Sequence, residues 1–245
     1  MIRGIDVSVY NSDEPKAPID WQEVANSGVT FAFLRASVGY EVDAAFPYNY
    51  DEAGKAGVLR GAYHYFHPDK SLGEQAKIHL AVVGDRPTEL PSVLDLEKKV
   101  DLSAKTISER SYGWLMAVAD ETGKRPLIYT SPGYWNGVFK EDPPEWTGLF
   151  DLWVADWGQN NNPDDFFDPR LPRGFTKWLF HQHTSKGRTP GIVGDVDLNK
   201  WHSTLEDLKI YAGINSEPEE PPTVHVNLST TAPEGVKVVY VIEDD

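Results

Sequence analysis

The segment Leu90–Glu97 reads LPSVLDLE, an apolar run that ends in two carboxylates separated by one residue. Side chains at positions i and i+2 lie on the same face of a β-strand, so Asp95 and Glu97 are expected to point the same way. Leu94 and Leu96 then lie on the opposite face, as in a strand that helices cover. The segment therefore predicts a strand of an α/β protein whose two acids face a barrel interior or a cleft.

The two acids suit proton-transfer chemistry. Two carboxylates held close together cannot ionise independently, so the pKa of one rises and that group can donate a proton near neutral pH while the other stays charged. Glycoside hydrolysis uses this division of roles. A single D-x-E at a strand end is more often an ordinary solvated pair, so the interpretation depends on other acids at equivalent positions.

The composition limits the classes of protein that fit. The chain has 245 residues, a formal net charge of −15 at pH 7 and no cysteine. These values exclude a disulfide framework and a thiolate metal site, and they disfavour binding to nucleic acid or to anionic membranes. No stretch approaches the roughly 18 apolar residues of a membrane span, and the first residues read as a strand, so we expect synthesis in the cytoplasm without a signal peptide. Eight Trp, eleven Tyr and ten Phe can offer flat faces to sugar rings, although most must fill the core.

The hydrophobic pattern predicts eight strands, separated in the first part of the chain by amphipathic helices. The strands cover Ile2–Ser8, Thr30–Ser37, Leu59–Phe66, Leu90–Glu97, Pro126–Thr130, Phe150–Asp156, Lys177–Thr184 and Gly194–Leu198. The helices cover Trp21–Asn26, Tyr48–Ala56, Leu72–Val83 and Ser103–Thr122. Ser103 is a plausible N-cap of the last helix, and Gly123 follows its end. Strands alternating with helices predict a parallel sheet, and eight such strands predict a closed α/β barrel of the TIM type, with an irregular part after Thr130.

Acidic and aromatic side chains recur where these strands end, which is where such barrels place their chemistry. The acids are Asp6, Asp95, Glu97, Asp156, Asp195 and Asp197, and the aromatic residues are Tyr63, Tyr65, Tyr129 and Trp153. The first and eighth strands are neighbours in a closed barrel, so Asp6 and Asp197 are expected to approach each other. An acidic cleft with aromatic walls and no phosphate-gripping glycines or lysines favours a neutral polysaccharide over a nucleotide.

Seven segments in order along the chain resemble the glycoside hydrolase family 25 lysozymes, the muramidases of bacterial autolysins and phage endolysins. They are Gly4–Ser8, Phe31–Gly39, Gly61–Phe66, Leu94–Glu97, Pro126–Ser131, Leu152–Ala155 and Gly194–Asn199. The resemblance spans about residues 1–210 and implies an irregular TIM-like (β/α)5(β)3 barrel. It also implies a cofactor-independent enzyme that cleaves the β-1,4 bond between N-acetylmuramic acid and N-acetylglucosamine in bacterial peptidoglycan. We interpret the chain as an endolysin-type muramidase that acts on the cell wall after its release from the cytoplasm.

The resemblance also assigns roles to individual residues. Glu97 becomes the general acid, and Asp95, Asp6 and Asp197 become supporting carboxylates. Asp95 could orient the substrate's 2-acetamido group as an internal nucleophile, or it could stabilise oxocarbenium charge directly. The choice depends on the separation of the two carboxyl groups, which is roughly 5 Å where one of them is a direct nucleophile and about 6.5–9.5 Å where a water molecule lies between them. Asp195 shares a strand face with Asp197 but could equally be a turn or rim residue. The expected substrate-binding residues are Tyr63, Tyr65, Tyr129, Trp153 and Gln182.

Two alternatives stay open at this point. The seventh strand carries His181-Gln182-His183 where the family usually has Trp-Gln-Tyr. Its two imidazoles, with Asp197 from the next strand, could bind zinc as a hydrolytic centre, although barrel metallohydrolases of this kind generally carry H-x-H on the first strand. The other alternative is a catalytically silent protein that binds cell-wall glycans. His64 and His67 are expected to be a histidine at the edge of the core and a loop residue.

The chain changes character after Ala212, where the expected catalytic barrel of residues 1–212 ends. Residues 213–222 form an acidic, proline-rich linker, and residues 223–245 read as a β-hairpin too small to fold alone. The apolar run Val236–Ile242 would be an exposed edge strand, which favours pairing with another chain. We therefore expect this C-terminal hairpin to mediate self-association or to begin a wall-binding module.

Overall fold

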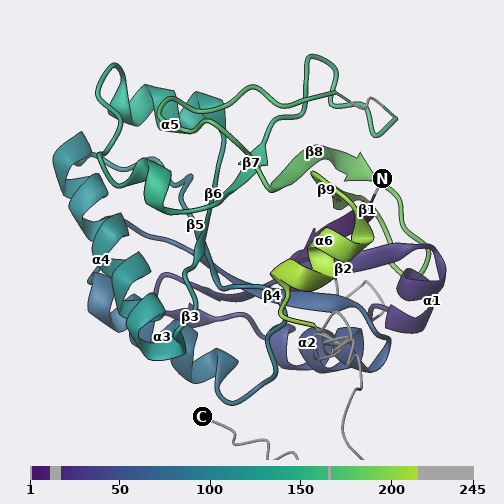
Figure 1. The fold of residues 1–245 in the computed structure, drawn as a ribbon. Helices are drawn as coiled ribbons and strands as arrows, with labels where there is room; N and C mark the ends of the chain where they lie inside the picture. The colour runs from purple at the N-terminus through teal and green to yellow at the C-terminus, as the bar shows by residue number, and fades with distance from the viewer. Residues whose placement is uncertain (1, 12–17, 165–166, 215–245) are drawn as a thin grey trace, which may run out of the picture.

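The computed structural model describes residues 2–11, 18–164 and 167–214. The expected linker and C-terminal hairpin, and with them the expected self-association, lie outside the described residues. The described part forms one closed barrel with helices around much of its outside (Figure 1). None of the described helices is both long enough and apolar enough to cross a membrane.

The barrel wall consists of eight strands in the order in which they were predicted. They are β1 (Ile2–Val7), β2 (Val29–Val38), β4 (Leu59–Tyr65), β5 (Val93–Asp95), β6 (Leu127–Thr130), β7 (Leu152–Ala155), β8 (Phe180–Gly187) and β9 (Val196–Trp201). The sheet closes because β1 pairs with β2 on one side and with β9 on the other. A two-residue strand, β3 (Glu41–Val42), adds a short antiparallel pairing to the end of β2. The barrel confirms the predicted TIM-like α/β architecture.

One strand runs against the rest. Apart from the short β3, the strands from β1 to β8 pair in parallel, whereas β9 is antiparallel to both β8 and β1. A sheet made of parallel strands alone was therefore the wrong expectation at this position. The connection from Gly187 to Val196 contains no helix that could carry the chain back across the barrel, so β9 must return in the opposite direction.

The predicted helices form between the early strands. They are α1 (Trp21–Asn26), α2 (Phe46–Lys55), α3 (Leu72–Val83) and α4 (Ala104–Thr122). In α4 the Ser103 side chain accepts a hydrogen bond from the backbone N–H of Thr106, and Gly123 follows the helix with φ 66°. Both predicted caps are thus confirmed.

Two helices in the later part of the chain escaped prediction. Helix α5 (Pro132–Phe139) contains two glycines, which weaken the helical pattern, but Ser131 caps it and Pro132 occupies its first turn. Helix α6 (Leu205–Tyr211) is one short segment that begins with a capping box between Thr204 and Asp207. Short helices such as these depend on caps and packing more than on a long periodic pattern.

Helix α6 closes the end of the barrel opposite the ends of the parallel strands. Its buried Leu208 belongs to the same apolar cluster as Trp201, which pairs with Ile2 at the start of β1. The rings of Trp201 and Tyr211 lie 5.4 Å apart. The chain therefore seals one end of the barrel and leaves the carboxyl-terminal ends of the parallel strands as the place for a site (Figure 1).

Aromatic rings fill the barrel below that site. Phe33 stacks on Trp153 with ring centroids 4.4 Å apart and meets Phe180 edge-on at 4.9 Å. Gly61 on β4 leaves room for Phe33, because a Cβ there would lie 2.5 Å from the Phe33 ring. Two further apolar clusters join the outer faces of the strands to the surrounding helices. Phe33, Trp153 and Phe180 thus form a packed aromatic floor beneath the polar residues of the site.

Candidate active site

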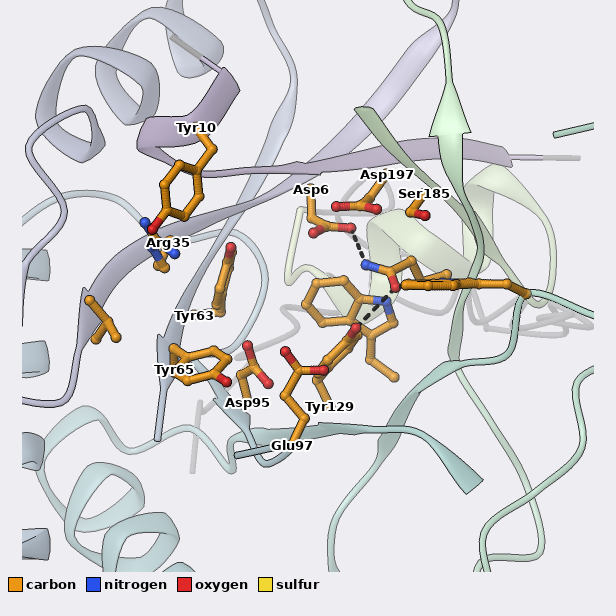
Figure 2. A pocket seen from close by; sticks show the side chains of 14 residues that line it. Asp6, Tyr10, Arg35, Tyr63, Tyr65, Asp95, Glu97, Tyr129, Ser185 and Asp197 are labelled. Carbon is orange, nitrogen blue, oxygen red and sulfur yellow. Dashed lines mark hydrogen bonds between the residues drawn. The ribbon is translucent and has the colours of Figure 1, made fainter. Parts of the chain in front are cut away.

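A pocket of about 600 Å³ opens at the carboxyl-terminal ends of the parallel strands. Four carboxylates that come from different parts of the chain point into it (Figure 2). The lining residues are Asp6, Tyr10, Arg35, Val38, Tyr63, Tyr65, Asp95, Glu97, Tyr129, Trp153, Trp157, Gln182, Ser185 and Asp197. Every residue that the sequence nominated for catalysis or substrate binding lies in this set.

Asp197 reaches the pocket in a way that the sequence analysis did not foresee. It lies near the beginning of β9, not at the end of a parallel strand, and it pairs with Asp6 in the antiparallel register. Because β9 runs in the opposite direction, its first residues lie beside the last residues of β1. The expected approach of Asp6 and Asp197 therefore holds, although the strand direction behind it was wrong.

Asp95 and Glu97 lie at and just beyond the end of β5. The strand ends at Asp95, two residues earlier than expected. The chain stays extended because the Leu96 backbone N–H donates to the Tyr129 carbonyl at 2.9 Å and the Thr130 hydroxyl donates to the Leu96 carbonyl at 2.8 Å. These bonds hold Leu96 in the core and turn both neighbouring carboxylates into the pocket (Figure 2).

The surroundings of both acids raise their pKa values. Burial, followed by the negative charges of Glu97 and Asp6, raises the pKa of Asp95 well above its ordinary value. Burial and the charge of Asp6 also raise the pKa of Glu97. Asp95 is 5% exposed, and its Oδ1 atom has no hydrogen-bond partner among the described residues. Burial and like charges thus act on both acids in the direction that the proton-donor hypothesis requires of one of them.

Asp6 and Asp197 form a second acidic pair on the other side of the pocket (Figure 2). Asp6 Oδ2 accepts hydrogen bonds from Gln182 Nε2 at 2.9 Å and from Asn199 Nδ2 at 2.7 Å. Asp6 and Asp197 also share a hydrogen bond. Burial raises the pKa of both, and the charges of Asp6 and Glu97 raise the pKa of Asp197 further. Such a pair holds one proton between its two carboxyl groups near neutral pH.

The aromatic residues around the pocket differ in how much of each ring is accessible. Tyr63, Tyr129 and Trp153 are buried, with Trp153 only 1% exposed. Tyr10 is 70% exposed and Trp157 is 41% exposed, and both lie at the rim. Sequence reasoning missed these two rim residues because each follows the end of a strand, β1 or β7, where no periodic pattern marks it.

Arg35 is the single cation among the described residues that line the pocket. Its Nε atom donates to the buried carboxylate of Asp43 at 2.7 Å, and its guanidinium lies over the Tyr10 ring at 5.0 Å. Its positive charge acts against the burial that raises the pKa of Asp95. Arg35 lies within a segment that resembles the family, but it was not predicted to be a site residue.

The two strand histidines do not face the pocket. Gln182 points inward, whereas His181 and His183 lie on the opposite face of β8, as strand alternation requires. His181 Nε2 lies 2.8 Å from the carbonyl oxygen of Asp156. Asp197 lies inside the barrel, so the proposed zinc ligands are on different faces. Within the described parts of the chain, no three His, Cys, Asp or Glu side chains gather as a metal site.

The remaining polar candidates have structural partners away from the pocket. Asp156 accepts hydrogen bonds from Arg170, the shortest at 2.6 Å. Asp195 is exposed and forms an ion pair with Arg188 at 2.9 Å, and it does not line the pocket. His64 is buried, and its ring nitrogens lie within hydrogen-bond distance of Ser37 and Gln75.

Comparison with known proteins agrees with this geometry. The family model for glycosyl hydrolases family 25 matches residues 5–192. The protein YegX of Escherichia coli K12 is 36% identical over 228 residues, covering 89% of this chain and 76% of YegX. Lysozyme M1 of Streptomyces globisporus is 32% identical over 222 residues, covering 84% of this chain and 70% of its own length.

The fold agrees as well. The crystal structure of the bacterial lysozyme from Streptomyces coelicolor superposes with a TM-score of 0.71 at 29% identity, covering 87% of this chain and 98% of that one. The family match covers most of the barrel and includes three of the four pocket carboxylates. The chain therefore belongs to glycosyl hydrolase family 25 and is a glycoside hydrolase of the lysozyme (N-acetylmuramidase) type.

Proposed function

We propose that this enzyme cleaves the β-1,4 bond between N-acetylmuramic acid and N-acetylglucosamine in peptidoglycan, with Glu97 as the general acid. The observation that carries the proposal is the position of Glu97, a partly buried acid in the pocket whose pKa is raised by burial and by the charge of Asp6. Two relatives bear names that agree with this activity, Lysozyme M1 and an N,O-diacetylmuramidase of Arthroderma benhamiae.

In this mechanism Glu97 donates its proton to the oxygen of the departing sugar. A positioned acid of this kind must be protonated at the working pH and must lie within reach of the leaving oxygen. Glu97 is less buried than Asp95, so it is the more accessible of the two acids to a glycan in the pocket. The negative charge of Asp6 helps to keep the proton on Glu97 until the bond breaks.

Asp95 supports the reaction from a deeper position. Asp95 lines the pocket, so its carboxylate can accept the N–H of the substrate's 2-acetamido group. A hydrogen bond from an N–H favours the charged carboxylate, so substrate binding would leave Asp95 charged and the proton on Glu97. Charged Asp95 then either aligns the acetamido oxygen as an internal nucleophile or stabilises the positive charge that develops on the sugar ring.

Product analysis tests the proposal directly. Full-length enzyme is incubated with purified peptidoglycan, and mass spectrometry identifies the sugar at each new reducing end. We expect N-acetylmuramic acid there. N-acetylglucosamine at the new reducing ends, or release of peptides alone, would contradict the proposed bond.

A matched pair of variants tests the role of Glu97. Glu97→Gln keeps the size of the side chain but cannot donate the proton, so the rate should fall at least ~100-fold, as expected when a general acid is lost. Glu121→Gln removes an exposed acid near the end of α4 and should leave the rate unchanged. Wall lysis by Glu97→Gln at the wild-type rate would overturn the assignment. Binding to the wall without new reducing ends in the wild type would favour the silent binding protein.

A further inference from the structure

Two buried amide side chains converge on one oxygen of Asp6. Gln182 Nε2 and Asn199 Nδ2 both donate to Asp6 Oδ2, at 2.9 Å and 2.7 Å. Gln182 and Asn199 are directly paired across β8 and β9, and they are 3% and 1% exposed. The antiparallel pairing of these two strands therefore brings both amides to the same carboxylate.

Aromatic donors fix the orientation of each amide. Gln182 Oε1 accepts from the Tyr129 hydroxyl and from Trp157 Nε1, both at 2.9 Å. Asn199 Oδ1 accepts from Trp153 Nε1 at 2.7 Å. A flipped amide would set its NH₂ group against these donors and its oxygen against Asp6, so both flips are unfavourable. The two NH₂ groups are therefore held toward Asp6.

We propose that Gln182 and Asn199 are positioning residues that keep Asp6 charged and leave the proton of the acidic pair on Asp197. An amide nitrogen only donates hydrogen bonds, so both contacts favour the ionised form of Asp6. Asp197 shares a hydrogen bond with Asp6 and, as the protonated partner, donates it. The pair then has a defined charged member and a defined neutral member.

This arrangement acts on the general acid across the pocket and, in that respect, rests on the proposed function. Charged Asp6 is the neighbour whose negative charge raises the pKa of Glu97. The amides therefore help Glu97 to hold its proton without touching it. The titratable and charged groups that face Asp6 from the surrounding elements are Arg35 on β2, Tyr63 on β4, Asp95 on β5, Glu97 after it, Tyr129 on β6 and Asp197 on β9.

Two substitutions of Gln182 separate this role from a merely structural one. Gln182→Met keeps the length of the side chain and removes the donor to Asp6, but it also leaves Tyr129 and Trp157 without their acceptor. Gln182→Glu keeps an acceptor for both aromatic donors and replaces the NH₂ group by a carboxylate oxygen. Either change removes a hydrogen bond that favours charged Asp6, and the Glu variant adds a like charge beside it. Ser185→Ala is the control, because Ser185 lines the same pocket and its hydroxyl accepts a hydrogen bond from Asn161.

The experiment follows Asp6 by carbon-13 NMR of carboxyl-labelled aspartate in full-length enzyme without substrate, with Asp6→Asn to identify the signal. We expect the titration of Asp6 to move up by about one pH unit in Gln182→Met, which is the loss of one hydrogen bond to a charged group, and by more than that in Gln182→Glu, whose carboxylate adds a like charge. The acid limb of the pH profile of kcat/KM should move up by the same amount. Both should stay at the wild-type position in Ser185→Ala.

Titration of Asp6 at the wild-type pH in both Gln182 variants would overturn the inference, whatever products the enzyme makes. A shifted titration combined with products of another bond would support the inference and contradict only the proposed function. An equal shift in Ser185→Ala would also overturn it, because the effect would then come from any change in the pocket.

Discussion

Protonation of a buried histidine should make the protein less stable in acid, and His79 allows the size of this effect to be calculated. His79 on α3 is fully buried, with Nε2 2.9 Å from the Ser92 hydroxyl and its ring centroid 5.2 Å from that of Trp114. Burial, followed by the nearby His64, lowers the pKa of His79 from 6.5 to about 3. The unfolded chain therefore binds a proton between these two pH values that the folded chain does not.

The sign and the size follow from proton linkage. The stability that neutral His79 contributes is fully present above pH 6.5 and is lost as the pH falls toward 3. Each pH unit between the two pKa values costs about 1.4 kcal/mol, so a change from pH 7.5 to pH 5 costs about 2 kcal/mol at this residue. The buried carboxyl groups of the pocket have raised pKa values and act in the opposite direction, so the effect must be read as a difference between variants.

Urea unfolding of the full-length wild type and of His79→Gln at pH 7.5 and pH 5 provides that difference. The wild type should lose about 2 kcal/mol of its advantage over His79→Gln between the two pH values, because glutamine takes up no proton. Val118→Ala, a buried substitution on α4 without a titratable group, should cost the same at both pH values. A stability difference between wild type and His79→Gln that does not change with pH would refute the reasoning.

Two further substitutions test the site and the floor beneath it. Asp95→Asn should reduce activity by about 100-fold through loss of a positioned charge, yet it should raise stability, because burial and like charges raise the pKa of Asp95 in the folded state. A group with a raised pKa in the folded state stabilises the fold below its unfolded pKa and loses that contribution as the pH rises. The gain in melting temperature of Asp95→Asn over the wild type should therefore be larger at pH 8 than at pH 5. A smaller gain at pH 8 would contradict the assignment. Gly61→Ala should destabilise the barrel by about 1–3 kcal/mol in urea unfolding, because the added Cβ would lie 2.5 Å from the Phe33 ring. Unchanged stability would contradict this prediction and would show that the Phe33 ring can move aside at no cost.

The sequence was sufficient to predict where the strands lie and which acids face the pocket, because both depend on local patterns. Alternation and apolar runs mark each strand, and a carboxylate two residues after another stays on the same face wherever the strand lies. Strand direction is different, since the pattern of β9 reads the same in either direction. The expectation that Asp197 ends a parallel strand failed for this reason, and only the short connection after Gly187 hinted at the return.

The hydrogen bonds that orient the site could not be read from the sequence. Asp6 and Asn199 are 193 residues apart in the chain, and Asp6 and Gln182 are 176 apart. Each contact depends on barrel closure and on strand register to within one residue, because a shift by one would turn the amide to the outside. The sequence places the acids at the correct end of the barrel, whereas their protonation depends on partners that only the closed fold supplies.

The aromatic residues show why a residue type at a strand end does not define its role. Trp153 was expected to bind sugar, yet it is 1% exposed, and its indole N–H donates to Asn199. Trp157, four residues later, is 41% exposed and can offer a ring face to a glycan while its N–H donates to Gln182. Stacking requires an accessible face, whereas orientation of a buried amide requires only a donor in the right place. Burial therefore distinguishes the two residues: the buried Trp153 orients Asn199 through its N–H, and the half-exposed Trp157 orients Gln182 while one face of its ring stays accessible to a ligand.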